Sequence, residues 1–207
     1  MKKYDEAFFR AKTNKRAKIA WLVLVIVACV YYAIKVYTGK IAFGYATIVA
    51  VTGWVSYIAG FIILKLKGND YAGYKWIVGL LYMLFFSLIA WTALDQVSFV
   101  FILPLISILI LYKDPKFIKV MMWATMFVLI TSNIYKGVAK GMIEFVSSAE
   151  CALQFAIVLC CYACTNMAIK HLVESDGALT DSIENELQSV VQTLEQARGA
   201  SKQIVDG

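Results

Sequence analysis

Residues 19–37 read IAWLVLVIVACVYYAIKVY, an apolar run whose one charged residue is Lys35. A helix of about 20 such residues crosses a hydrocarbon core of about 30 Å. Five more apolar blocks follow, separated by short charged stretches, at residues 41–64, 76–93, 97–112, 116–135 and 149–169. Because lipid offers the backbone no hydrogen-bond partners, each crossing segment must be a helix. The sequence therefore predicts an all-α, polytopic membrane protein with six transmembrane helices.

The composition indicates the same class. Of the 207 residues, 61% are hydrophobic and 16% are charged, and the mean hydropathy is +0.70, above that of a soluble domain. The sequence contains no glycine-rich phosphate loop, no G-x-S-x-G and no H-E-x-x-H motif. We therefore expect that the protein is not an enzyme and binds no cofactor. We expect membrane lipid to be its main surrounding partner.

The positive charges predict the orientation. The net charge is +6, but the lysines and arginines flank the apolar blocks, which argues against nucleic acid as a partner. If the N-terminus is inside, four of the twenty lysines and arginines lie outside: Lys35, Lys40, Lys136 and Lys140. The other sixteen lie in a basic leader at residues 1–18, in the two inner loops and in the tail. The protein is therefore expected in the cytoplasmic membrane with both termini in the cytoplasm.

Two further features of the sequence bear on this topology. The residues before Cys29 resemble a lipoprotein cleavage box, but the apolar run continues past it, so we expect an uncleaved helix. Aromatic residues near the block ends predict an interfacial belt, namely Trp21, Tyr37, Trp76, Trp91 and Tyr135.

The tail, residues 171–207, is acidic and repeats every seven residues. Position d of the heptad holds Ile183, Val190, Ala197 and Ile204, and position a holds Thr180, Leu187, Leu194 and Ser201. This pattern predicts a cytoplasmic coiled coil that joins chains into a homodimer or higher assembly. A helix lying on the membrane is the alternative, but anionic lipid repels acidic residues. The chain thus divides into a leader (1–18), a six-helix domain (19–170) and a heptad helix (171–207), with no stop signal at Gly207.

A polar cluster at the predicted outer side is the candidate ligand-sensing site. It comprises Asp95, Gln96, Ser132, Asn133, Glu144 and Glu150. Polar residues at membrane depth are costly and often functional. The alternative is that these residues simply meet water at the outer interface. The outer loops are too short to fold a separate binding domain.

Cys160, Cys161 and Cys164 form a weak candidate for a metal or redox site. Cys160 and Cys164 lie one helical turn apart, but the lone histidine, His171, is too far along the same helix to be a fourth ligand. Packing between helices, in which cysteine acts as a small apolar residue, is the favoured interpretation, so we expect no metal.

The chain resembles the N-terminal part of clostridial-type methyl-accepting chemotaxis proteins. The strings that carry the resemblance are LYKDPKF at 111–117, SNIYKG at 132–137, CCYACTN at 160–166 and GASKQIVDG at 199–207. The resemblance implies a polytopic membrane sensor that runs directly into a signalling coiled coil. It also implies that a stimulus shifts the sixth helix and that the helix relays this shift to the coil.

Two family features are absent from these 207 residues. There are no paired Glu or Gln methylation sites, and there is no hairpin tip that contacts the chemotaxis kinase and its adaptor. Those partners are therefore expected only through a further C-terminal region. The alternatives are the membrane sensor of a histidine kinase or nucleotide cyclase, or a small transporter.

Overall fold

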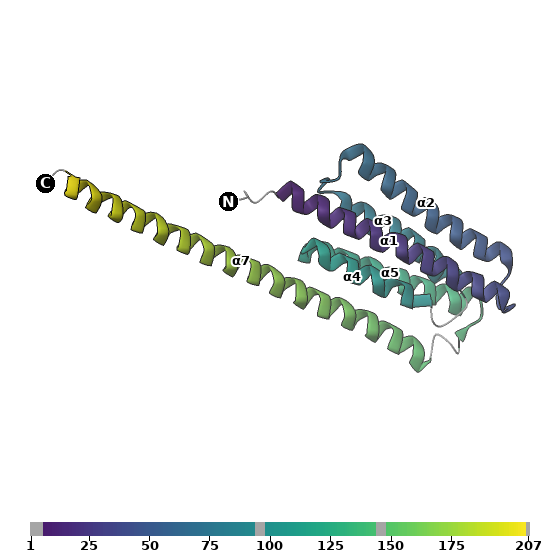
Figure 1. Ribbon diagram of the computed structural model, residues 1–207. Helices are drawn as coiled ribbons and strands as arrows, with labels where there is room; N and C mark the ends of the chain where they lie inside the picture. The colour runs from purple at the N-terminus through teal and green to yellow at the C-terminus, as the bar shows by residue number, and fades with distance from the viewer. Residues whose placement is uncertain (1–5, 94–97, 144–147, 206–207) are drawn as a thin grey trace.

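The computed structural model describes residues 6–93, 98–143 and 148–205, and throughout these residues the regular structure is helical. The elements in order are α1 (Glu6–Tyr37), α2 (Phe43–Lys67), α3 (Tyr74–Thr92), η1 (Ser98–Ile102), α4 (Leu103–Leu109), η2 (Ile110–Tyr112), α5 (Pro115–Ala139) and α7 (Ala149–Val205). Figure 1 shows a bundle of antiparallel neighbours, with α7 continuing far beyond it.

Among the described residues, five helices are long and apolar enough to cross a membrane: α1, α2, α3, α5 and α7. Their outward faces carry many exposed hydrophobic side chains, such as Val27, Val55 and Phe127. Apolar surface of that extent suits lipid rather than water. The all-helical fold and the five long apolar helices fit the predicted multi-pass membrane protein.

The fourth predicted crossing differs from the rest. Residues Ser98–Tyr112 form a short apolar segment in which 3₁₀ turns flank a seven-residue α-helix. Pro104 lies in the first turn of α4 and has no N–H for an α-helical bond to the preceding turn. Pro104 therefore interrupts the α-helical hydrogen bonding of this block where η1 gives way to α4.

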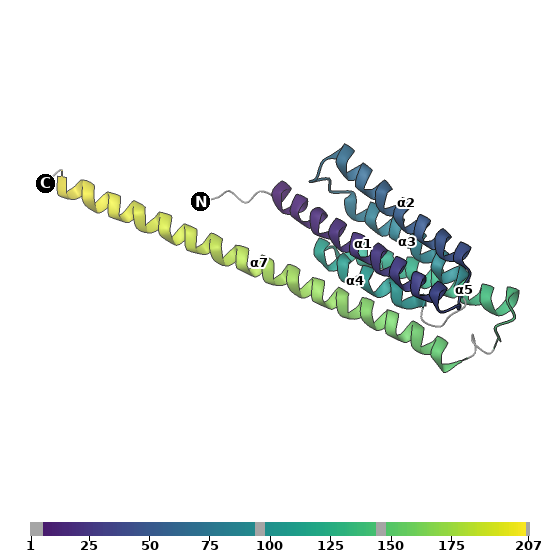
Figure 2. The same cartoon turned by 45° about the vertical axis from the view of Figure 1, so that its right-hand side comes forward.

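The predicted boundaries at residues 18 and 170 fall inside helices. α1 runs without interruption from Glu6 through the basic leader, and α7 runs from the last apolar block through the tail. Figure 2 shows both α1 and the free part of α7 pointing toward the same end of the bundle. We call this end, where α1 begins and α7 leaves, the basal end, and the opposite end the distal end.

Two turns are set by specific residues. α1 ends at Tyr37, and Gly39 just beyond it has a left-handed φ of 70°. The N–H of Lys40 donates to Lys35 O at 2.9 Å, which completes a Schellman motif. α5 begins at Asp114, whose carboxylate accepts hydrogen bonds from the N–H groups of Lys116 and Phe117 at 3.0 and 3.1 Å. Pro115 at the first helical position supports this start.

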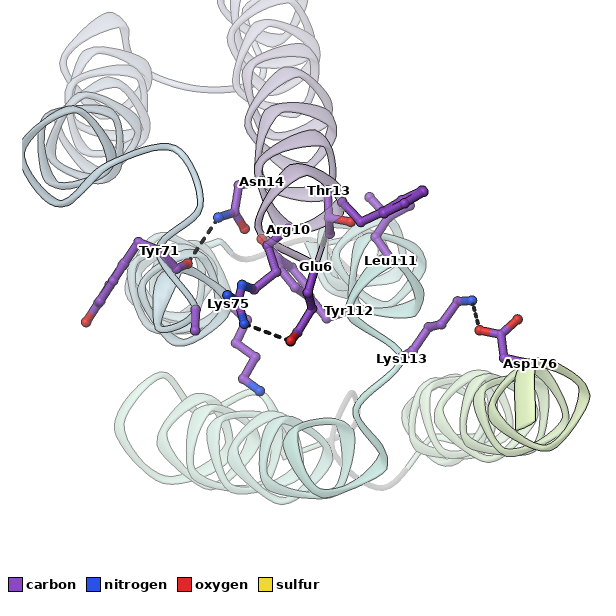
Figure 3. Close-up of a pocket in the computed structure, with 12 residues that line it drawn as sticks. Glu6, Arg10, Thr13, Asn14, Tyr71, Lys75, Leu111, Tyr112, Lys113 and Asp176 are labelled. Carbon is purple, nitrogen blue, oxygen red and sulfur yellow. Dashed lines mark hydrogen bonds and ion pairs between the residues drawn. The ribbon is translucent and has the colours of Figure 1, made fainter. Parts of the chain in front are cut away.

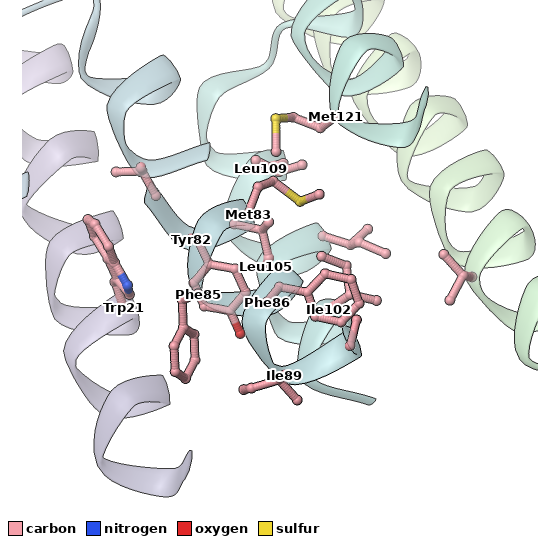
Figure 4. Packing of buried hydrophobic residues seen from close by; sticks show 14 of the residues in the cluster. Trp21, Tyr82, Met83, Phe85, Phe86, Ile89, Ile102, Leu105, Leu109 and Met121 are labelled. Carbon is pink, nitrogen blue, oxygen red and sulfur yellow. The ribbon is translucent and has the colours of Figure 1, made fainter. Parts of the chain in front are cut away.

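The core packs large aromatic residues against glycines. α3 supplies much of it, including Tyr82 and Phe86, and lies among α1, α4 and α5 (Figure 4). On α2 the small residues Gly53, Ser56 and Gly60 form one buried face. Small residues of this kind let membrane helices approach closely. Trp21, predicted from the sequence for the interfacial belt, is instead fully buried against Gly60.

Candidate functional site

The contact between α5 and α7 contains buried polar side chains. Thr125 Oγ1 and Tyr162 Oη lie 2.7 Å apart, and Thr125 also donates to Met121 O at 2.8 Å. Nearer the distal end, Asn133 Nδ2 donates to Gln154 Oε1 at 3.5 Å. Polar contacts in a dry interior hold two helices in one register, because any other register leaves a polar group unsatisfied.

Lys136 continues this row at the distal end of α5. Its side chain is only 2% exposed, and it lies close enough to the buried Cys151 to act on the thiol electrostatically. We call these six residues the α5–α7 seam: Thr125, Asn133 and Lys136 of α5, and Cys151, Gln154 and Tyr162 of α7. Buried ionisable residues in membrane helices mark functional sites by default.

The seam includes part of the predicted outer cluster and changes its interpretation. Asn133 and Ser132 are buried between helices, which contradicts, for these two residues, the alternative that the cluster simply meets water. Glu150 is exposed, in the first turn of α7. Asp95, Gln96 and Glu144 lie outside the described residues.

Sequence reasoning missed most of the seam. Thr125, Gln154 and Tyr162 were not candidates, and Lys136 was named only as one of the four lysines on the predicted outer side. The sequence nevertheless contains a signal for this face, namely a spacing of three or four residues. The residues with this spacing are all buried in the structure: Cys151, Gln154, Val158, Tyr162, Thr165 and Ile169.

A second polar cluster lies at the basal end, around a cavity of about 420 Å³ that we call the basal cavity. Residues from α1, the α2–α3 turn, η2 and α7 surround it (Figure 3). Asn14 Nδ2 donates to the backbone oxygens of Asn69 and Tyr71 at 2.9 and 3.0 Å. These two bonds fix the start of α1 to the α2–α3 turn.

Three ion pairs between described residues border the basal cavity. Arg10 Nη1 bonds Glu6 within α1 at 2.8 Å, and Lys75 Nζ bonds Asp114 at 2.6 Å between α3 and α5. Lys113, which has a left-handed φ of 48°, pairs with Asp176 of α7. The last pair connects the bundle to α7 at the level where that helix leaves it.

Asp114 is the most constrained acid of this cluster. Burial alone would raise its pKa, but hydrogen bonds from Lys75 and from the Phe117 and Lys116 N–H groups, with the charge of Lys75, together lower it. The carboxylate therefore stays ionised while it caps α5 and holds Lys75.

The cysteine candidates lie apart from both clusters. Cys160 and Cys164 are on the exposed face of α7, and Cys161 is half-buried. Among the described residues no three His, Cys, Asp or Glu side chains gather closely enough to hold a metal ion.

The tail of α7 is exposed on every side. Ile169 is its last buried residue, and Ile183, Leu187, Val190 and Leu194 are between 40% and 64% exposed. Thr180 and Ala197 are exposed as well, and the side chains of Ser201 and Ile204 lie outside the description. The predicted heptad face is thus helical and open to a partner.

Comparison with known proteins adds no relative. No protein-family model, no curated protein and no solved structure matches this chain.

Proposed function

We propose that this chain is the membrane part of a signal-transducing receptor whose bundle senses a stimulus and whose α7 relays it to a cytoplasmic coiled coil. The continuity of α7 carries the proposal. One helix begins beside α5, forms half of the seam, and extends past Asp176 by roughly 45 Å at 1.5 Å per residue. Any shift or rotation of α7 in the seam must move the tail.

Six crossings are consistent with this role. The segment Ser98–Tyr112 mixes 3₁₀ and α turns, whose rises give it a length of roughly 26 Å. It runs between the distal aromatic group, where Phe101 stacks on Tyr32, and the basal end, where Asp114 meets Lys75. Such a segment comes close to the hydrocarbon thickness of about 30 Å.

The charge distribution favours a cytoplasmic basal end. Cationic residues near the basal end include Arg10, Lys75 and Lys113, whereas Lys40 and Lys140 follow the distal ends of α1 and α5. The positive-inside rule then places both termini in the cytoplasm. In this orientation the seam residue Lys136 lies toward the outside, where a stimulus would arrive.

The exposed heptad face supports self-association. Helices in proteins gain most of their stability by packing an apolar face, and this row of exposed Ile, Leu and Val has no partner within the described residues. Two or more copies anchored in one membrane align in parallel and bury this face in a coiled coil. Thr180 at a core position weakens the packing and keeps alternative arrangements close in energy.

The sequence resemblance favours a chemoreceptor as the output. The chemotaxis kinase and its adaptor would then bind a region that follows residue 207. The coding sequence beyond that position tests this point. Paired Glu or Gln sites and a hairpin support a chemoreceptor, and a kinase, cyclase or transporter sequence contradicts it.

Cross-linking in membranes tests the relay itself. Single cysteines in a cysteine-free background at Ile183, Val190 or Ala197 should cross-link between chains, whereas Ser182, Ser189 and Gln196 lie on the opposite face and should not. Asn133→Leu removes a polar contact of the seam and should let α7 rotate. The highest cross-linking yield should then move from the heptad positions to neighbouring positions of the tail. Ile130→Leu, on the exposed face of α5, is the control. An unchanged profile in Asn133→Leu would contradict the relay.

A further inference from the structure

We propose that the basal cavity binds a phosphate group, carried either by an anionic lipid headgroup or by a soluble phosphate compound. Its volume of about 420 Å³ falls in the range of small-ligand sites. It lies at the end of the bundle where the membrane surface meets water. The residues that would hold the phosphate are Arg10, Tyr112 and Lys113, all of which line it.

The Arg10 guanidinium has hydrogen-bond donors that the described contacts do not use. A guanidinium carries five N–H donors, and the described contacts use Nη1, which bonds Glu6 at 2.8 Å. The Nε atom is buried and has no hydrogen-bond partner among the described residues. The planar fork of arginine matches two oxygens of one phosphate, so a phosphate in the cavity would accept hydrogen bonds from two N–H groups of this guanidinium.

Tyr112 supplies a second unsatisfied donor. Its hydroxyl oxygen is buried and also lacks a partner within the described part of the chain. A buried polar group without a hydrogen bond is costly, and two at one cavity require an explanation. Both residues line the cavity, so a rotation of each side chain toward a bound phosphate would give its buried donor an acceptor.

Lys113 can exchange its partner, and Lys75 cannot. The acids that hold Arg10 and Lys113 are mostly in water, since the side chains of Glu6 and Asp176 are 70% and 58% exposed. Exposed ion pairs of this kind contribute little and are easily displaced. Lys75 and Asp114 are each only about a quarter exposed, and Asp114 also caps α5. Lys75 therefore supports the wall, and Arg10 and Lys113 receive the ligand.

Occupancy would act on α7. A phosphate bound by Lys113 competes with Asp176, the acid through which the tail is tied to the bundle. Binding would therefore loosen the junction between bundle and tail. The binding step itself does not depend on the receptor role proposed above, and it is measured without any signalling output.

The test uses the purified full chain in phosphatidylcholine nanodiscs. Two probes distinguish the sources: radiolabelled inorganic phosphate in equilibrium dialysis, and phosphatidic acid doped into the disc and counted by native mass spectrometry. Arg10→Gln or Lys113→Gln should weaken binding about tenfold or more, and Tyr112→Phe about threefold. Asp176→Asn should tighten binding, because it removes the competing acid.

The matched controls are Lys40→Gln and Lys140→Gln, exposed lysines outside the basal cavity, which should bind as the unmodified chain does. Retention of phosphatidic acid alone assigns the site to a headgroup, and binding of both probes assigns it to the phosphate group itself. The proposal is overturned if neither probe binds, or if the control variants weaken binding as much as Arg10→Gln and Lys113→Gln. It is also overturned if Asp176→Asn weakens binding.

Discussion

Thr125 Oγ1 lies 2.7 Å from Tyr162 Oη, and this buried contact joins the middle of α5 to the helix that forms the tail. Both hydroxyls also reach the Met121 carbonyl, at 2.8 and 3.3 Å. The pair therefore shares one acceptor, and a change in either residue alters the bonding of the other.

A double-mutant cycle measures this coupling. Thr125→Val replaces a hydroxyl with a methyl group and Tyr162→Phe removes a hydroxyl, so the packing volume is nearly kept. We expect a coupling of about 0.6 kcal/mol, and no more than about 1.7 kcal/mol, as for other hydrogen bonds between membrane helices. Unfolding by steric trapping in bicelles gives the four stabilities. Additive effects would show that the two hydroxyls do not interact.

Gly60 and Trp21 give the second prediction. A Cβ atom on Gly60 would lie 2.5 Å from the Trp21 ring, and this ring is fully buried. Gly60→Ala should therefore destabilise the fold by about 1–3 kcal/mol through overpacking. The smaller side chain of Trp21→Leu should relieve part of this cost when both changes are combined.

Gly44 is the matched control on the same helix. A Cβ atom there meets nothing within 4 Å. Gly44→Ala should leave stability unchanged or raise it by up to about 1 kcal/mol, because alanine favours the helix. Equal destabilisation by the changes at Gly44 and Gly60 would contradict the close approach of α1 and α2. Thermal unfolding in one detergent compares the two variants.

Five of the six apolar blocks correspond to long helices in the described part of the chain, because lipid leaves the backbone no alternative to helix, whereas the block at 97–112 forms shorter turns. The observed bounds of α2, Phe43–Lys67, differ by only a few residues from the predicted 41–64. Which face of each helix is buried could not be predicted in the same way. Both lipid and protein interior are apolar, so Trp21 fits either environment by composition, and only packing against Gly60 decides.

The polar clusters show a second feature that could not be predicted from the sequence, namely which charged residues pair. Lys75 and Asp114 are 39 residues apart in the sequence, and Lys113 and Asp176 are 63 apart. Each of these charges flanks an apolar block, so the sequence places them at one membrane surface. It does not pair them, because pairing depends on which helices are neighbours. The seam residue Asn133 was a candidate, but its partner Gln154 follows only from the packing of α5 on α7.

Asp114 gives the third prediction. Its folded-state pKa is lowered below the ordinary value of 3.8, so the ionised carboxylate stabilises the fold above that pH. This contribution is lost as the pH falls through the folded-state pKa. Asp114→Asn keeps an oxygen for the helix cap but removes the charge, and it should cost up to about 1 kcal/mol near neutral pH. The difference from the unmodified chain should vanish in strong acid.

Asp114→Ala separates the cap from the ion pair. It should cost about 1 kcal/mol more than Asp114→Asn at every pH, because the N–H groups of Lys116 and Phe117 lose their acceptor. Stability measured by denaturant titration between neutral and acidic pH gives both quantities. Identical stabilities of the Asn and Ala variants would remove the capping role.

The last prediction concerns the segment Ser98–Tyr112, which decides between six crossings and five. Single cysteines in a cysteine-free background are treated in intact cells with a thiol reagent that does not cross the membrane. If the segment crosses, positions 40 and 140 should react from outside, and positions 12, 69 and 116 should not. The reason is that α5 then starts in the cytoplasm, beside Lys75 and the α2–α3 turn. If the segment instead turns back within the membrane, position 116 should react from outside while positions 12 and 69 stay protected. That result would leave the five long helices in place but would reverse the orientation of α5 and α7. The tail would then lie outside the cell, and the relay to a cytoplasmic coiled coil would be contradicted.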